Sequence, residues 1–346
     1  MRSSMPESQP EKAPASSRFE PERRKPADPR NCEICGGREA YQAFRAKGLA
    51  PGDPPFRVLR CPDCGYGWTE PRPSEQEIGR WYPSEYYGRE NARFNPLFER
   101  LSRWFRDRRA AEVSRRIPRG RVLDVGCGRG FTLGRLKELG YEAHGIELSD
   151  ESAWHARHRM GATVHVGDFA SAPLEPGSFD AVIFRHSLEH FRRPVDAVRH
   201  AHRLLRRGGL LMVAVPNSDS LQARVFRADW FHLDIPRHYV HFGLRSLEAL
   251  LLRAGFRVRS TAHFCLEQNP YGWLQSLYNG LELEWNLLYT ILKNDTARMI
   301  PLRKHPLQAA AVVALLPLFL PLSLLLTLLE AALRKGGTIE LYATKE

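Results

Sequence analysis

Residues Val122–Gly130, which read VLDVGCGRG, decide the fold because they join an apolar run directly to a glycine-rich loop. The first four residues, 122–125, have the apolar and β-branched composition of a buried strand. Three glycines follow at alternate positions, and a segment with helical character begins at Phe131. Glycine lets a backbone turn tightly and approach a ligand closely. The stretch therefore predicts a strand, a ligand-binding turn and a helix in that order.

Outward from this loop, strand-like and helix-like segments alternate between about residue 120 and residue 265. The apolar, β-branched runs that predict strands are 122–125, 143–147, 163–166, 181–184 and 210–215, with two more at 256–264 and 338–344. Residues 247–254 predict a helix that ends at Gly255. Alternation with this period is typical of an α/β fold with a doubly wound, mostly parallel sheet.

Two carboxylates stand at the carboxyl ends of the strands that follow the glycine loop. Glu147 ends the strand predicted at 143–147, where it can accept hydrogen bonds from the hydroxyls of a ribose. Asp168 and Phe169 come after the strand at 163–166. Each of these residues alone is typical of a turn or a strand end, but the three elements in this order indicate one ligand-binding crevice.

At this point the sequence resembles the class I S-adenosylmethionine-dependent methyltransferases, over residues 115 to 265 and the final strand. The resemblance implies a Rossmann-like sheet of seven strands, in which the last strand is antiparallel and inserts between the fifth and sixth. It also implies S-adenosylmethionine as cofactor and assigns residues to it. The expected cofactor residues are Gly126, Gly128 and Gly130 for the methionine part, Glu147 for the ribose, Asp168 and Phe169 for the adenine, and Asp124 for the loop or the cofactor amine.

Methyl transfer to an acceptor that carries a proton needs a base close to the methyl group. His190 lies in the segment Phe184–Phe191, after the predicted fourth strand, and similar Leu-Glu-His segments occur in small-molecule methyltransferases. His186, earlier in that segment, is expected beside the cofactor. His238, in a Pro-Arg-His segment before the helix at 247, is a second catalytic candidate. The alternative for each is a structural histidine, and the spacing does not favour a metal cluster of these residues with His241.

A separate module precedes this domain. Cys32, Cys35, Cys61 and Cys64 form two C-x-x-C pairs separated by 25 residues, which is the spacing of a tetrahedral four-thiolate zinc site. The alternative is two pairs of surface thiols. The module resembles the zinc-binding segment in front of some sugar C-methyltransferases, and this likeness includes Tyr86 and Tyr87. Four thiolates leave no open position on the metal, so the zinc is expected to be structural.

The chain divides into five predicted parts. Residues 1–30 are rich in proline, serine and charge and predict a disordered tail. The zinc-binding module and its aromatic tail occupy 31–90, and residues 91–120 predict a basic amphipathic helix, for which core packing and docking on an anionic surface are both open. The methyltransferase core is expected at 121–265 and 337–346, with a membrane-associating helical insertion at 266–336.

The insertion contains the longest apolar run of the chain. Residues 307–329 include 23 positions without a charged side chain, enough for a helix of about 34 Å, which would cross a bilayer core of about 30 Å. A final strand inside the sheet argues against crossing. Pro317 and Pro321 favour a re-entrant hairpin, with a span or burial against a partner subunit as alternatives. An aromatic stripe from Trp273 to Tyr289 is expected either at the membrane interface or in the core.

Composition limits the function further. Lys and Arg number 51 against 39 Asp and Glu, a net charge of +12, which favours anionic partners without choosing among them. Six cysteines and the lack of an apolar leader predict a cytoplasmic protein. The apolar insertion predicts that this protein is attached to the inner face of the membrane. We expect methyl transfer to a hydroxyl, carbon or amine of a lipid-linked, glycan or other small-molecule acceptor. The alternatives are an RNA methyltransferase, which the insertion disfavours, and a non-enzymatic scaffold that keeps the cofactor fold.

Overall fold

The computed structural model describes residues 31–46, 48, 49, 53–82, 96–292 and 303–346. The predicted tail at 1–30 and the pair Tyr86 and Tyr87 lie outside these residues. The larger of two sheets has seven strands in the order β10-β11-β8-β7-β4-β5-β6. Strands that are adjacent in this order from β8 through β7, β4 and β5 to β6 pair in parallel. Strand β11 pairs antiparallel with both β8 and β10. The predicted sheet, including the position of its last strand, is therefore confirmed.

The strand positions follow from the apolar runs in the sequence. The strands of this sheet are β4 (Arg121–Val125), β5 (Glu142–Glu147), β6 (Thr163–Val166), β7 (Phe179–Arg185), β8 (Leu205–Pro216), β10 (Phe256–Ala262) and β11 (Thr338–Lys345). All seven were predicted, although β10 ends two residues before the expected end and β8 begins five residues early.

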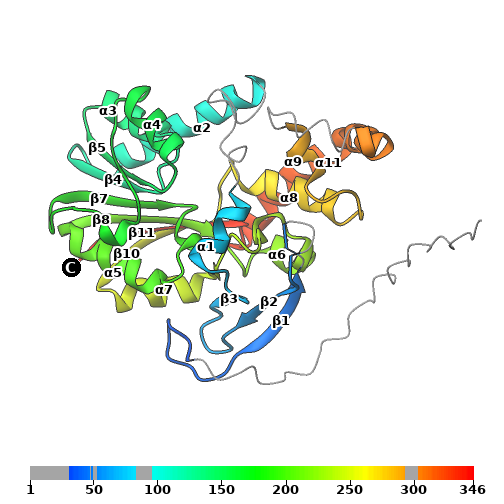
Figure 1. Cartoon of the computed structure of the whole chain (residues 1–346), viewed down its shortest axis with the longest axis horizontal. Helices are drawn as coiled ribbons and strands as arrows, with labels where there is room; N and C mark the ends of the chain where they lie inside the picture. Colours follow the sequence, from blue (N-terminus) through cyan, green and yellow to red (C-terminus); the bar gives the residue numbers. More distant parts are fainter. Residues whose placement is uncertain (1–30, 47, 50–52, 83–95, 293–302) are drawn as a thin grey trace, which may run out of the picture.

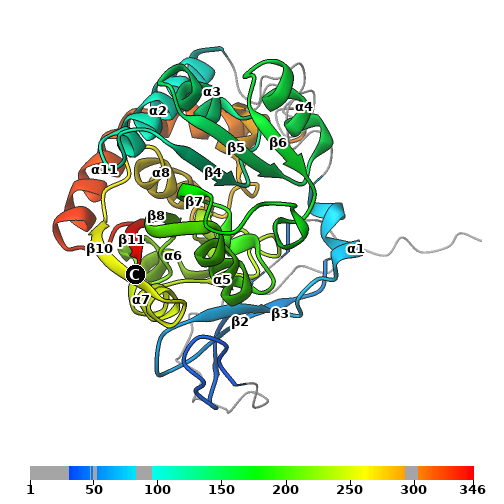
Figure 2. The ribbon, with the colours of Figure 1, turned by 90° about the vertical axis from the view of Figure 1, so that its left-hand side faces the viewer.

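Helices cover both faces of this sheet (Figures 1 and 2). One face packs against α2 (Pro96–Ser114), α3 (Phe131–Glu138) and α4 (Asp150–His158). The other packs against α5 (Pro194–Leu204) and α7 (Leu244–Arg253). The helix α2 is the predicted basic helix: its Ala110 and Val113 are buried, and Leu101 and Trp104 are each 45% exposed.

The second sheet belongs to the cysteine module. Its order is β1 (Tyr41–Ala46), β2 (Phe56–Arg60), β3 (Gly67–Glu70) and β9 (Val240–His241), all antiparallel. The first three strands come from the module, whereas β9 comes from the loop in front of α7. The short helices α1 (Glu75–Ile78) and η1 (Gly79–Trp81) follow β3. Ile34, Tyr66 and Trp68 share one buried cluster with residues of α5 and α7, so the module is part of the domain core.

The remaining helices lie between β8 and β11. They are α6 (Leu221–Phe226), η5 (Arg227–Asp229), η6 (Phe231–Leu233), α8 (Asn269–Asn279), α9 (Leu287–Leu292) and α11 (Pro306–Ala332). In Figure 1, α8, α9 and α11 gather at the end of the molecule opposite the label of the C-terminus. Two short 3-10 turns, η3 (Phe169–Ser171) and η4 (Leu188–His190), follow β6 and β7.

The structure corrects one expectation about this insertion and decides between the two alternatives for another. The re-entrant hairpin is wrong, because α11 is one continuous helix of 27 residues with Pro317 and Pro321 inside it. The aromatic stripe is mostly core: Trp273, Tyr278 and Leu288 are buried. Tyr278 supports α11 across the prolines, since its hydroxyl donates to the Val312 carbonyl at 2.7 Å and its ring contacts Phe319.

Candidate functional site

Three loops meet at the carboxyl ends of β4, β5 and β6, and backbone hydrogen bonds join them. The Gly126 and Cys127 N–H groups both donate to the Ile146 carbonyl on β5, at 2.9 and 3.0 Å. The Gly167 N–H donates to the Glu147 carbonyl at 3.0 Å. The strand ends that carry the predicted cofactor residues therefore form one continuous edge.

The three positions of the loop require glycine for different local reasons. All adopt positive φ, between 53° and 81°. A Cβ at Gly126 would lie 2.8 Å from Cβ of Ser187, in the turn after β7, and one at Gly130 would lie 2.5 Å from Cβ of Ala156 in α4. A Cβ at Gly128 would meet nothing within 4 Å. Gly126 and Gly130 thus allow close packing, whereas Gly128 borders the open side of the loop, where a ligand would lie.

The two acidic residues next to this loop are both buried. The Glu147 carboxylate accepts hydrogen bonds from the Gly128 N–H at 2.7 Å and the Ser149 N–H at 2.9 Å. These bonds fix the carboxylate, and its remaining lone pairs are those a ribose would use. Burial raises the pKa of Glu147, and it raises the pKa of Asp124 to about 6, although Arg109 and Arg185 act in the opposite direction.

The predicted adenine residues lie one strand further along. Asp168 is exposed and accepts a hydrogen bond from the Ala170 N–H at 3.1 Å. Phe169 is only 2% exposed and packs edge to face against Phe184, Phe191 and His200. Phe169 therefore supports the loop from within the core, and its expected place beside the adenine ring stays a prediction.

On the other side of the glycine loop, His190 and His238 lie against each other. Their ring centroids are 4.7 Å apart. Nδ1 of His190 lies 3.0 Å from the Arg237 carbonyl, and Nδ1 of His238 lies 3.0 Å from the His232 carbonyl. A carbonyl oxygen only accepts, so each Nδ1 carries a proton, and in the neutral form of either ring Nε2 then carries the lone pair. Burial also lowers the pKa of His238 well below its ordinary value, which keeps this ring neutral.

Glu189, which the sequence did not single out, completes this pair. Its carboxylate is 2% exposed, and among the described residues neither oxygen has a hydrogen-bond partner. Its Oε1 lies 3.5 Å from Nδ1 of His186 and 4.0 Å from Nε2 of His238. Glu189, His190 and His238 together bring one oxygen and two nitrogens within 4.8 Å of one another. A buried carboxylate without a partner is costly, and such a group marks a place where a proton or a ligand belongs.

The cysteine module reaches this histidine pair directly. The Tyr82 hydroxyl lies 2.9 Å from Nδ1 of His190. On β3, Thr69 donates its hydroxyl to the His238 carbonyl at 2.8 Å and lies 3.0 Å from Nε2 of His241. His241 is thereby engaged with β3 and does not join a cluster with the other histidines. Tyr82 had no sequence signal, because it meets His190 only through the fold.

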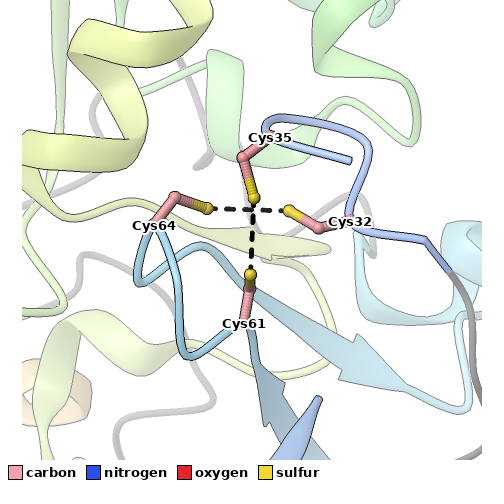
Figure 3. Close-up of side chains that lie close together, drawn as sticks. All are labelled: Cys32, Cys35, Cys61 and Cys64. Atoms are coloured by element: carbon pink, nitrogen blue, oxygen red, sulfur yellow. Dashed lines mark hydrogen bonds between the residues drawn. The ribbon is translucent and has the colours of Figure 1, made fainter. Parts of the chain in front are cut away.

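The four cysteines converge as the spacing predicts (Figure 3). Sγ of Cys32 lies 3.6 Å from Sγ of Cys64, Sγ of Cys35 lies 3.6 Å from Sγ of Cys61, and all four lie within 4.8 Å of one another. Tetrahedral Zn²⁺ with bonds of about 2.3 Å needs sulfur atoms about 3.8 Å apart. The donor set therefore fits zinc with small adjustments.

Arginines of α7 fix this cysteine cluster to the domain. Arg253 donates to the Ile34 carbonyl, between the first two cysteines, and Arg245 donates to the Asp63 carbonyl, between the second two. A glycine follows each cysteine pair, and these two residues, Gly36 and Gly65, have φ angles of +79° and +76°. Both C-x-x-C turns are thus of the same type, and both are held by one helix.

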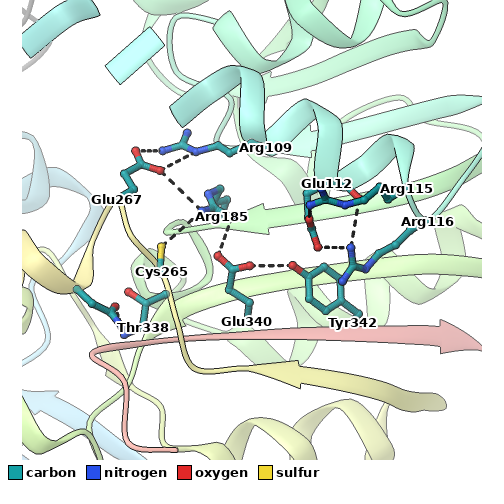
Figure 4. Close-up of polar contacts among 11 residues, drawn as sticks. Arg109, Glu112, Arg115, Arg116, Arg185, Cys265, Glu267, Thr338, Glu340 and Tyr342 are labelled. Carbon is teal, nitrogen blue, oxygen red and sulfur yellow. Dashed lines mark hydrogen bonds and ion pairs between the residues drawn. The ribbon is translucent and has the colours of Figure 1, made fainter. Parts of the chain in front are cut away.

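A half-buried network of charges ties α2 to the sheet (Figure 4). Arg109 of α2 pairs with Glu267, and Arg185 at the end of β7 lies 3.0 Å from Glu340 on β11 and 3.7 Å from Glu267. Burial alone would raise the pKa of Glu267, but Arg109 and Arg185 lower it to about 2. The network holds α2 over the carboxyl edge of the sheet, close to Asp124.

The fold and the loops define a class of protein: a doubly wound α/β domain with an antiparallel seventh strand and a cofactor edge of glycines and carboxylates. Residues 91–261 match a family model described as "Methyltransferase domain". This part of the chain is a methyltransferase domain of the class I S-adenosylmethionine-dependent type, as the resemblance of its glycine loop implied.

Curated relatives share part of this chain. The ubiquinone biosynthesis O-methyltransferase of Xanthomonas campestris is 37% identical over 115 residues, which are 31% of this chain and 47% of that protein. A 37.1 kDa protein of transposon TN4556 from Streptomyces fradiae is 35% identical over 154 residues, 40% of this chain and 43% of that protein. The chain thus spans about half the length of the curated relatives it matches.

Solved structures also align with the chain. A methyltransferase from Archaeoglobus fulgidus shares 21% identity with a TM-score of 0.42, covering 69% of this chain and 94% of that chain. One from Mesorhizobium loti shares 17% identity with a TM-score of 0.40, covering 65% and 91%.

Proposed function

We propose that this protein transfers a methyl group from S-adenosylmethionine to a hydroxyl of a small-molecule acceptor. The observation that carries the proposal is the position of the histidine pair and Glu189 directly beside the glycine loop. Ser187, in the same turn as these residues, packs against Gly126: a Cβ on that glycine would lie 2.8 Å from Cβ of Ser187.

The residues of the cofactor edge would bind S-adenosylmethionine as predicted: Gly126, Gly128 and Gly130 against the methionine part, Glu147 on the ribose hydroxyls, Asp168 and Phe169 near the adenine, and His186 and Asp124 beside the methionine end. When bound, the cofactor supplies a sulfonium methyl group that a nucleophile attacks directly. The protein therefore needs no nucleophile of its own, and its work is to orient the acceptor and take its proton.

The proton of the acceptor hydroxyl would pass to Nε2 of His190, the base of the proposal. Its Nδ1 is held by the Arg237 carbonyl and Tyr82, so the lone pair points away from these groups. His238 and the buried Glu189 carboxylate would stabilise the positive charge that develops on the base. The alternative acceptor atoms, a carbon or an amine, would use the same base.

The acceptor class is the finer part of the proposal. A relative is named as an O-methyltransferase of ubiquinone biosynthesis, which supports a hydroxyl of a small molecule. The apolar helix α11 supports a lipid-linked or glycan-type acceptor at the inner face of the membrane, in the cytoplasm. We do not expect nucleic acid to be the acceptor. Salt-dependent binding of the protein to RNA would instead favour the alternative of an RNA methyltransferase.

We also propose that Cys32, Cys35, Cys61 and Cys64 hold one structural Zn²⁺. The closed set of four thiolates supports this role, since no ligand position is left for an acceptor. The metal would fix the module whose Tyr82 and Thr69 hold the histidine pair.

Calorimetry with S-adenosylmethionine tests the proposed site. We expect saturable binding by the wild-type protein and a more than tenfold weaker Kd for Glu147→Ala, because the ribose loses its carboxylate. Glu175→Ala, an exposed carboxylate far along the chain, is the matched control and should bind like wild type. Absence of saturable binding by the wild type would refute the proposal.

Transfer of tritiated methyl groups to a panel of phenols, catechols and polyprenyl phenols then tests the acceptor. Saturable binding without transfer to any acceptor in the panel or to extracted cell lipids would instead support a scaffold.

A further inference from the structure

One face of α11 is apolar and exposed along the whole helix. Its most exposed large side chains are Leu307, Val313, Leu318, Leu325 and Leu328, between 59% and 85% exposed. Only 17% of the most apolar stretch of this helix is buried, and the helix is long and apolar enough to cross a membrane by composition. Monomeric proteins rarely expose a continuous apolar patch of more than a few hundred square ångströms unless it binds something. We call these five residues the leucine face.

The opposite face of α11 is fixed to the protein. Val312 is 1% exposed and packs in a cluster with Leu274, Tyr278, Leu287 and Leu288 of α8 and α9. Near the end of the helix, Glu330 is fully buried and accepts hydrogen bonds from Gln222 Nε2 and from the Gly337 N–H, each at 3.0 Å. Two polar side chains in the second half of the helix, Ser323 and Thr327, also face inward and are at most 1% exposed. The helix thus has a side that packs on the protein and a side that none of the described residues covers.

Both ends of α11 are held by the same globular body. Only five residues separate Ala332 from Thr338, the start of β11, which lies inside the sheet. At the other end, the Gln308 side chain accepts a hydrogen bond from the Glu284 N–H at 2.8 Å. A helix perpendicular to a bilayer would carry this body into the hydrocarbon. The geometry therefore excludes a span and leaves an orientation parallel to the membrane plane.

Basic residues flank the leucine face at both ends of α11, and the exposed Glu284 at the first end is paired with His305 at 3.7 Å. Arg303 and Lys304 precede the helix and Arg334 follows it, and all three are exposed. Between them, residues 307–329 carry no charge. Trp285, 40% exposed, lies in the loop next to Gln308, and tryptophan prefers the membrane interface. Basic residues near the surface attract anionic headgroups.

We propose that the leucine face lies flat in one leaflet of an anionic lipid bilayer, with α11 as an in-plane membrane anchor. This inference deepens the proposed membrane location, and it does not depend on methyl transfer. The charge pattern favours lipid over a second copy of the chain, because two such faces would bring the like-charged flanks of α11 together.

Flotation of the purified full chain with sealed vesicles tests the binding. Wild type should float with phosphatidylcholine vesicles that contain about a third phosphatidylglycerol, and more weakly with phosphatidylcholine alone. The double variant Leu325→Glu with Leu328→Glu should lower the partition coefficient at least tenfold. Leu252→Glu, which changes a leucine of α7 that is 72% exposed, is the matched control and should float like wild type. Unchanged S-adenosylmethionine affinity would show that each variant is folded.

A second measurement distinguishes the in-plane helix from a span. An azide-bearing residue is placed at Leu307 or at Leu333, both more than half exposed, and labelled with a nitrobenzoxadiazole dye. Dithionite added outside the vesicles should bleach both labels, because both ends stay on the outer side. Protection of one label would overturn the in-plane orientation. The lipid proposal is overturned if the wild type fails to float. A second copy would be the occupant if the wild type then sediments as a dimer and the double variant as a monomer.

Discussion

The two halves of the candidate site are built in different ways. The cofactor half comes from loops that follow β4, β5 and β6, and backbone hydrogen bonds such as that from Gly126 to Ile146 close it. The acceptor half combines Tyr82 of the cysteine module, His190 after β7 and His238 before α7. Side chains and the β3 to β9 pairing hold it together.

The two halves of the candidate site are therefore held in place by different structural elements. The cofactor edge depends on the sheet itself and has no described contact with the cysteine cluster. The histidine pair depends on the module, since Thr69 and Tyr82 contact it directly. Damage to the module should therefore act mainly on the acceptor side, and substitutions in the glycine loop should act mainly on cofactor binding.

The largest expected effect is on the proposed base. His190→Gln should lower kcat about 10²- to 10⁴-fold, the usual worth of a general base, with little change in S-adenosylmethionine affinity. The measurement is S-adenosylhomocysteine formation with the fastest acceptor of the panel, and calorimetry for the cofactor. The control is His158→Gln, an exposed histidine of α4. A loss of cofactor affinity as large as the loss of rate would show that His190 belongs to the cofactor half.

A smaller effect is expected from the loss of the metal. Cys61→Ser should abolish zinc binding and lower kcat/KM for the acceptor at least tenfold, because the supports of His190 and His238 loosen. The affinity for S-adenosylmethionine should change less than threefold. The measurements are zinc content by atomic absorption, kcat/KM for the acceptor and the affinity for S-adenosylmethionine. If kcat/KM and the cofactor affinity fall in parallel, the separation of the two halves is wrong.

The smallest effect concerns Asp124 and pH. Its pKa is raised to about 6 by burial, so below pH 6 the carboxyl is protonated and cannot attract the cofactor amine. The affinity for S-adenosylmethionine should be level above pH 7, fall about twofold between pH 7 and pH 6, and then fall by up to tenfold for each unit below 6. Asp124→Asn should bind more weakly at pH 7 and lose this pH dependence. An equal slope in wild type and variant would assign the titration to another group.

The sequence was most informative where the structure is local. The positions of the strands were predicted from apolar runs, and the convergence of the four cysteines was predicted from their spacing in one segment. The antiparallel last strand and its place in the sheet were expected from the family resemblance. The residues Gly126, Gly128 and Glu147 share one edge as expected. Their roles toward the cofactor stay predictions until binding is measured.

What the sequence did not show depends on tertiary contacts. Glu189 is unusual only because the fold buries it without a hydrogen-bond partner among the described residues, and Tyr82 meets His190 across 108 positions of the chain. The hairpin prediction failed for a related reason. Pro317 and Pro321 remove helical hydrogen bonds, but α8 packs along α11, and the segment between the prolines contains no residue that favours a turn.

The short connection from α11 to β11 fixes which way the side chains of the last strand point. Ile339, Leu341 and Ala343 face the apolar layer under α5 and α7, while Glu340 reaches Arg185 on the opposite face. Deleting one residue between Leu333 and Gly337 would slide the strand by one position and exchange these faces, placing a carboxylate among leucines. A change in length between α11 and β11 would therefore disrupt the packing of both faces of the sheet at this strand.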